Sequence, residues 1–152
     1  MRPRRVMGIA IVLIAWMCGG QAAAKTASSE AADRGQALLE AARHRDVSGV
    51  RTLLKHGADA NAPQPDGATA LHWAAHLDEV ALAELLVRSG ARVNQANKFG
   101  ATPLWLASVN GSASMVKKLL ELGADPNPAL RYGETPLLAA SRGGAVEVVR
   151  AL

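Results

Sequence analysis

Residues 100–124 read GATPLWLASVNGSASMVKKLLELGA, and this stretch contains the signals that decide the fold. Thr102 followed by Pro103 is typical of a helix start, because a hydroxyl can cap free N–H groups and proline is favoured at the first helical position. Asn110-Gly111 then indicates a turn. A one-sided apolar stripe follows it, made of Met115, Val116, Leu119 and Leu120. Since Gly123 is a common helix terminator, the stretch predicts two short helices joined by a turn.

The same signals recur along the chain with a period of 33 residues and no insertion. The recurring positions are Thr69, Thr102 and Thr135; Gly57, Gly90 and Gly123; Asn61, Asn94 and Asn127; and Leu53, Leu86 and Leu119. An earlier copy keeps Leu38, Ala41 and Ala42 in phase but has Gln36 where threonine is expected. No single copy could bury its own apolar faces, so the pattern predicts a stack of units.

With these motifs in register over residues 34–152, the sequence resembles an ankyrin-repeat protein. The resemblance implies an all-α ankyrin-repeat solenoid of helix–turn–helix–loop units with short β-hairpin-like loops. The predicted units are residues 34–66 (a capping repeat), 67–99, 100–132 and 133–152. The last unit stops inside its second helix, so we expect Val146, Val149 and Leu152 to be uncovered and the sequence to be a fragment of a longer protein.

The N-terminus has the three-part pattern of a secretory signal peptide. Three arginines within residues 2–5 precede the uncharged run Val6–Met17, and small residues then end in an Ala-x-Ala site at Ala24. The run is shorter than the ~20 residues that a spanning helix needs. We therefore predict a signal peptide over residues 1–24, a lead-in over 25–33, and export to a bacterial periplasm. Secretion, or an uncleaved anchor in the inner membrane, is the alternative.

The charge and the motifs exclude several classes of function. The chain has a net charge of +4, but removal of residues 1–24 leaves 14 Lys and Arg against 13 Asp and Glu, or +1. We therefore expect no nucleic-acid partner. His72 and His76 share one helix face, yet no third metal ligand accompanies them. No catalytic or cofactor motif stands out, so the region is predicted to be non-catalytic, without cofactor or metal, and a monomer.

The resemblance also implies where a protein partner binds, namely the loop tips and the ends of the first helices. The corresponding positions are Asp66, Lys98, Phe99, Arg131 and Tyr132 on the tips, and His76, Leu77, Val109, Asn110 and Arg142 at the helix ends. The aromatics Phe99 and Tyr132 either anchor a partner or fold back over their loops. Trp73 and Trp105, on neighbouring first helices, either pack between repeats or serve as partly exposed anchors.

Three functions are compatible with this sequence. The first is an exported protein-interaction module. The second is the targeting arm of a larger enzyme or effector whose catalytic domain lies beyond Leu152. The third is an envelope structural protein held by an uncleaved N-terminus.

Overall fold

The computed structural model describes residues 30–130 and 132–152 and consists of paired helices joined by long loops. A helical segment over residues 30–43 is followed by α2 (Val47–Lys55), α3 (Ala70–His76), α4 (Val80–Arg88), α5 (Pro103–Val109), α6 (Ala113–Glu121), α7 (Pro136–Arg142) and α8 (Val146–Ala151). The described residues contain no strand. The segment 30–43 runs through residue 34, so the predicted boundary between lead-in and first repeat lies inside a helix.

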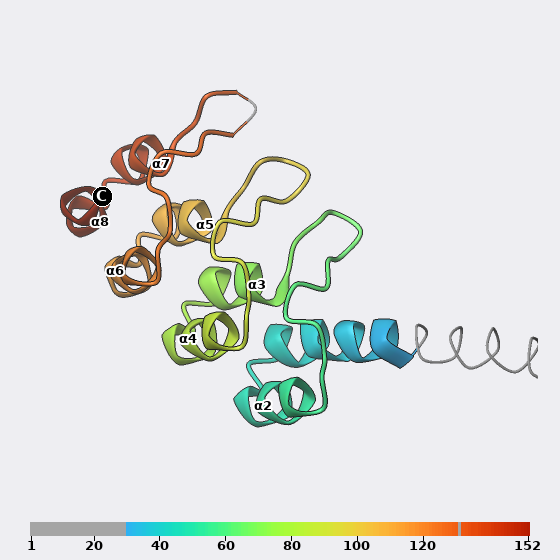
Figure 1. Ribbon diagram of the computed structural model, residues 1–152. Helices are drawn as coiled ribbons and strands as arrows, with labels where there is room; N and C mark the ends of the chain where they lie inside the picture. The colour runs from blue at the N-terminus through green and yellow to red at the C-terminus, as the bar shows by residue number, and fades with distance from the viewer. Residues whose placement is uncertain (1–29, 131) are drawn as a thin grey trace, which may run out of the picture.

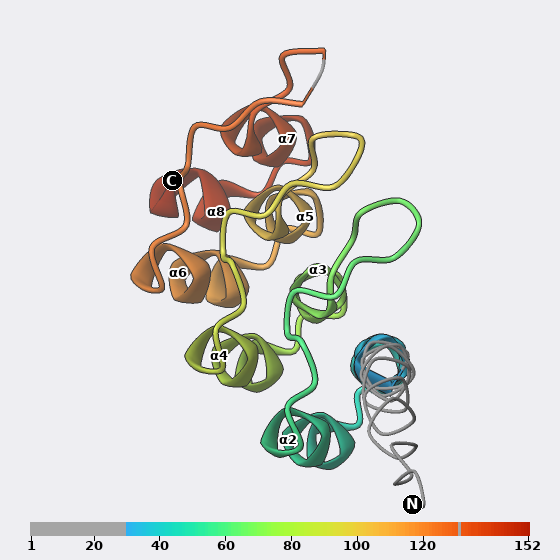
Figure 2. The same ribbon diagram turned by 45° about the vertical axis from the view of Figure 1, so that its right-hand side comes forward.

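The helices form two parallel rows (Figure 1). One row contains the segment 30–43, α3, α5 and α7, which we call the inner row, and the other contains α2, α4, α6 and α8. Within each row, every helix from α3 onward packs on the equivalent helix of the next unit. Hairpin-shaped loops project from the side of the inner row, one after another along the stack (Figure 2). The architecture is therefore the predicted all-α solenoid.

Hydroxyl side chains cap the starts of several helices. Thr102 Oγ1 accepts a hydrogen bond from the N–H of Trp105, and Thr135 Oγ1 accepts one from the N–H of Leu138, both at 3.2 Å. Ser112 caps α6 in the same way. Each cap pairs one of the N–H groups that a helix start leaves free.

The helix ends depend on the periodic glycines. Gly123 has φ of 91°, a left-handed conformation that other residues seldom adopt, and Gly57 and Gly90 repeat it. The N–H of Ala124, the next residue, donates to the carbonyl of Leu119 at 2.9 Å. This is the Schellman arrangement, which pairs the free carbonyls of the last turn and turns the chain toward the next hairpin.

The core is a continuous layer between the two rows. Alanines at the 33-residue spacing, Ala74, Ala107 and Ala140, are fully buried and let the inner-row helices approach closely. The stripe predicted on α6 is buried at Met115, Val116 and Leu119 and half-buried at Leu120. The core thus extends from unit to unit, as a stack of repeats requires.

Periodic asparagines tie each hairpin to the following one. Asn94 donates from Nδ2 to the carbonyl of Gly123 at 3.2 Å and accepts at Oδ1 from the N–H of Asp125 at 2.8 Å. Asn61 makes the equivalent pair of bonds to Gly90 and Arg92. These amides bridge backbone of successive repeats, so they hold the loops in register.

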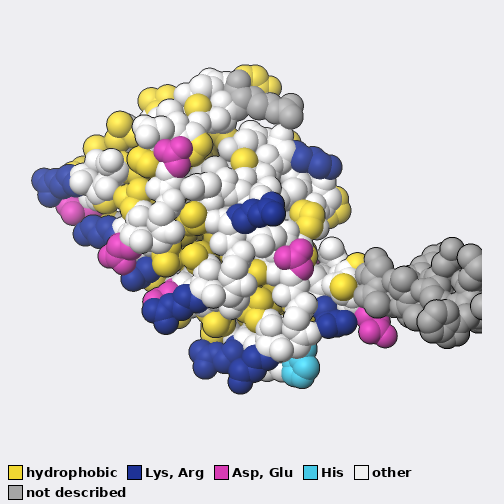
Figure 3. Space-filling view, in the orientation of Figure 1, with side chains coloured by type: hydrophobic (Ala, Val, Ile, Leu, Met, Phe, Trp, Pro, Cys, Tyr) yellow, Lys and Arg dark blue, Asp and Glu magenta, His cyan; other side chains and the backbone are white. Residues whose placement is uncertain are grey.

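The unit formed by α7 and α8 leaves apolar side chains exposed. Leu137 is 47% exposed, whereas Leu104, its equivalent one repeat earlier, is 1% exposed. Val149 is 36% exposed, whereas Val116 is fully buried. Figure 3 shows hydrophobic surface gathered over this end of the stack. The predicted exposure of Val146 and Val149 is confirmed, and Leu152 is half-buried.

Candidate functional site

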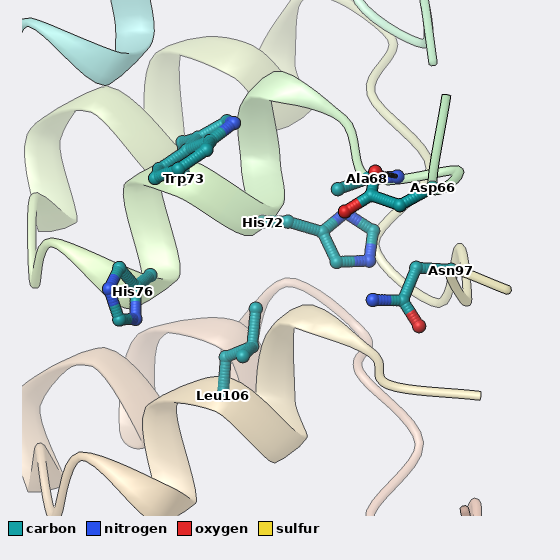
Figure 4. Close-up of a pocket in the computed structure, with 7 residues that line it drawn as sticks. All are labelled: Asp66, Ala68, His72, Trp73, His76, Asn97 and Leu106. Carbon is teal, nitrogen blue, oxygen red and sulfur yellow. Dashed lines mark hydrogen bonds between the residues drawn. The ribbon is translucent and has the colours of Figure 1, made fainter. Parts of the chain in front are cut away.

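Two hollows lie between the hairpins and the inner-row helices, at equivalent places in successive units. The first hollow has a volume of about 170 Å³ and is drawn in Figure 4. Its lining consists of Asp66, Ala68, His72, Trp73, His76, Asn97 and Leu106. The second hollow, of about 340 Å³, is lined by Trp105, Val109, Glu134, Ala139, Arg142 and Gly143. Tip, helix-end and tryptophan residues therefore share one surface.

His72 is a framework residue of the first hollow and is only 2% exposed. Its Nδ1 accepts from the N–H of Thr69 at 3.1 Å, so the neutral ring carries its proton on Nε2, which lies 3.1 Å from the carbonyl of Ala101 and donates to it. Burial lowers the pKa of His72 below its ordinary value, against the opposing effects of the Ala101 carbonyl and the Asp66 carboxylate. With both nitrogens engaged, this side chain joins α3 to the next hairpin and is not free to bind a metal.

Trp73 forms one wall of the first hollow and is half-buried. The Arg43 guanidinium carbon lies 5.4 Å from the centre of its ring, within the range of a cation–π interaction. His76 meets the same ring edge-on, with centroids 6.1 Å apart and planes at 77°. A cation, an indole and an exposed imidazole are therefore lined up beside the hollow.

Trp105 stands 33 residues after His72, and it lines the second hollow at the place where His72 lines the first. Its indole cannot repeat the two-sided bridge of the histidine. Among the described residues, the buried Nε1 of neither Trp105 nor Trp73 has a hydrogen-bond partner. Arg142 pairs with Glu134 at 2.7 Å, so the second hollow is apolar with one ion pair among its lining residues.

Comparison with known families supports the assignment of the repeats. A family model described as "Ankyrin repeats (3 copies)" matches residues 10–97, 38–130 and 79–152, which together include most of the chain. The chain belongs to the ankyrin-repeat family. No curated protein matches it. Ankyrin repeats are generally protein–protein interaction modules, and their fold is typically non-catalytic.

The ankyrin hairpin tips present their aromatic side chains to solvent. Phe99 is 65% exposed and Tyr132 is 99% exposed, so Tyr132 does not fold back over its loop. Lys98 is exposed, and its N–H donates to the carbonyl of Asp66 at 2.8 Å, which joins two neighbouring tips. Arg131, the remaining predicted tip residue, lies outside the described residues.

Some of the predicted helix-end side chains are exposed to solvent, and others form hydrogen bonds or ion pairs within the chain. His76 is exposed, Val109 is 48% exposed, and Leu77 is half-buried. The side-chain amide of Asn110 donates to the carbonyl of His76 at 2.7 Å, so it holds successive helix ends together. Arg142 is exposed while it pairs with Glu134.

The prediction missed the part that the first repeat plays in this surface. The sequence predicts residues 34–66 only as a capping repeat, but Arg43 lies over Trp73 and Arg45 pairs with Glu79 at 3.2 Å. Both partners belong to the second repeat. No local pattern shows these contacts, since they join different units.

Two kinds of feature are absent from residues 30–130 and 132–152. No helix there is long and apolar enough to cross a bilayer. No group of three or more His, Cys, Asp and Glu residues in that part of the chain is placed to hold a metal ion.

Proposed function

We propose that this chain is an exported protein-interaction module that captures a protein partner on its hairpin tips and inner-row helix ends. The observation that carries the proposal is the exposure of two large aromatics on adjacent tips, Phe99 at 65% and Tyr132 at 99%. Exposed aromatics of this kind are the residue type that dominates protein interfaces.

The placement of these tips supports a single continuous surface. Asp66, on the hairpin before Phe99, and His76, at the end of α3, line the same hollow. A partner that lies across the tips would therefore also meet the helix ends. Neighbouring tips lie about one repeat apart, roughly the 10 Å of two packed helix layers.

Truncation of both aromatics tests the proposal. The double variant Phe99→Ala/Tyr132→Ala is expected to capture the native partner at least about tenfold more weakly, the scale of interface hot spots. Its melting temperature should change little, because Phe99 is 65% and Tyr132 99% exposed. The matched control is Val146→Ala, which removes a similarly exposed apolar side chain, 58% exposed, on α8.

The assay is a pulldown from envelope extract of the source cells, beside a circular-dichroism melt of each variant. Normal capture by the double variant, or an equal loss in the Val146 control, would refute the placement of the site. Early melting of the double variant would show that the aromatics serve the fold.

Export to the periplasm is the second part of the proposal, and it rests on the arginines, the apolar run and the Ala22-Ala23-Ala24 site of the sequence. The exported protein is expected to begin at Lys25. N-terminal sequencing of the protein recovered from the envelope tests this, and a chain that begins at Met1 would favour the membrane-anchored alternative.

A further inference from the structure

We infer that the partner segment is an acidic peptide with one large apolar side chain, the apolar group entering the second hollow and a carboxylate reaching Arg43 and His76 beside the first. This inference rests on the proposed function, because it names the chemistry of the partner that the same surface would take. Three features of the surface carry it, namely the shape of the second hollow, the free charge and the spacing.

The second hollow is suited to an apolar side chain. Trp105 and Ala139 give it apolar walls, and Val109 at its side is 48% exposed. In the preceding repeat, His72 extends across the equivalent place to the next hairpin. Trp105 cannot make that bridge, and the second hollow is twice as large as the first.

The carboxylates that line the two hollows differ in how their charge is compensated. The Asp66 carboxylate accepts the N–H of Ala68 at 2.9 Å, and the Glu134 carboxylate is paired with Arg142. Glu134 is therefore neutralised by its ion pair, whereas Asp66 keeps its charge and lies on the side of the first hollow away from His76 (Figure 4).

Two cations near the first hollow, Arg43 and Lys98, have a long ion pair or none among the described residues. Arg43 is 56% exposed at its side chain, and its ion pair with Glu40 is long, at 3.9 Å. Lys98, on a hairpin tip, has no carboxylate within 4.0 Å among the described residues. Opposite charge on the partner is the complement of such a face, and it also speeds encounter.

The two hollows set the spacing of the two groups. They occupy equivalent places one repeat apart, about 10 Å for packed helix layers. An extended strand covers this in three residues at about 3.3 Å each, and a helix covers it in seven at about 1.5 Å each. The partner should therefore carry its carboxylate and its apolar anchor three or seven positions apart.

The probe is a displayed library of random 12-residue peptides, selected on the chain from Lys25 to Leu152. Selected peptides are expected to share an Asp or Glu and a Leu, Phe or Trp at one of these two spacings. Arg43→Gln and Val109→Glu should each weaken the selected peptides about tenfold or more. The matched control is Arg51→Gln on α2, an exposed arginine in the other helix row, where Figure 3 shows several Lys and Arg side chains.

The salt dependence of the peptide affinity distinguishes electrostatic binding from nonspecific hydrophobic binding. Binding to the unmodified chain should weaken as salt rises, and Arg43→Gln should flatten that dependence, because surface charges are screened. Melting curves of all variants exclude unfolding as the cause of a loss.

The outcomes distinguish the inference from the function on which it rests. Selected peptides without acidic residues, or peptides that Arg43→Gln leaves unaffected, would overturn the inference while capture at the tips still stands. Peptides that neither the hollow variants nor Phe99→Ala/Tyr132→Ala affect would overturn the proposed function as well.

Discussion

Replacement of His72 by leucine is the sharpest test of how this solenoid holds together. Leucine stands at the equivalent position of the last repeat, as Leu138, so the side chain itself is compatible with the helix. The substitution removes the contacts of the ring with the N–H and hydroxyl of Thr69 and with the carbonyl of Ala101. It leaves the N–H of Thr69 and the carbonyl of Ala101 without their partner in a region where His72, Thr69 and Ala101 are at most 5% exposed.

The expected cost follows from these two groups. A buried polar group that loses its partner costs about 1–3 kcal/mol. Two such groups give a loss of about 2–6 kcal/mol in the free energy of unfolding, reduced where water replaces the lost partners. This is a large share of the 5–15 kcal/mol typical of a whole domain.

Urea unfolding followed by circular dichroism measures the loss. The matched control is His76→Leu, which replaces an exposed histidine of the same helix and should change stability by less than about 0.5 kcal/mol. Equal urea midpoints for His72→Leu and the unmodified chain would refute the idea that this bridge stabilises the contact between repeats.

The same bridge predicts a dependence on pH. Its Nδ1 must accept from the Thr69 N–H, so the doubly protonated ring cannot form it. Burial lowers the pKa of His72 in the folded chain below the ordinary value of 6.5. The contribution to stability is therefore fully present above pH 6.5 and is lost as the pH falls through that value toward the folded pKa. His72→Leu should remove this part of the pH dependence, and an unchanged profile would contradict it.

Two further predictions concern the ends and the joints of the stack. A polar capping repeat added after Leu152 should raise the free energy of unfolding by several kcal/mol, because it would cover side chains such as Leu137 and Val149 that are buried in the preceding unit; unchanged urea midpoints would contradict this. Asn94→Ala should cost about 2 kcal/mol, since the amide bonds two backbone groups of the next hairpin. Asn127→Ala should cost clearly less, because among the described residues that amide bonds only Asp125 of its own turn. Equal losses in the two variants would show that the bridge between hairpins adds no stability.

The elements of this fold were predictable because their signals are local. Thr102, Pro103 and Gly123 act within one helical turn of their own position, so a sequence pattern is sufficient to place the ends of each helix. The 33-residue period then required the units to stack, since no unit could bury its apolar stripe alone. The sequence left open whether the tip aromatics are exposed or fold back over their loops, because that depends on how the side chains pack and not on a local signal.

The candidate site was predictable in position but not in composition. Arg43 reaches Trp73 and Asn110 reaches the carbonyl of His76 across the boundary between two repeats. Such contacts depend on how one unit sits on the next, and neither spacing nor hydrophobic pattern encodes that. The role of Trp105 could have been found, however, because the period places it directly at the position of His72.

Positions with the same residue in successive repeats serve the fold of this chain, whereas positions whose residue differs between repeats lie at its surface. The recurring threonines, glycines and asparagines cap helices, end helices and join hairpins. The positions that change from one repeat to the next lie at the surface, as in the series Asp66, Phe99 and Tyr132 and the series His76, Val109 and Arg142.

Trp105 is an exception to this separation of framework and surface positions. It stands at the position that one repeat earlier holds the framework residue His72. The change gives up the bridge that His72 makes, and it buries an indole N–H without a partner in the described part of the chain. A residue that breaks a local rule at a cost to stability is a marker of function, since proteins accept such costs mainly at their binding sites. Trp105 lines the larger of the two hollows, where Ala139 stands in place of the Leu106 that lines the first, next to the exposed Val109. The second hollow is therefore where we expect the specificity of this protein for its partner to be decided.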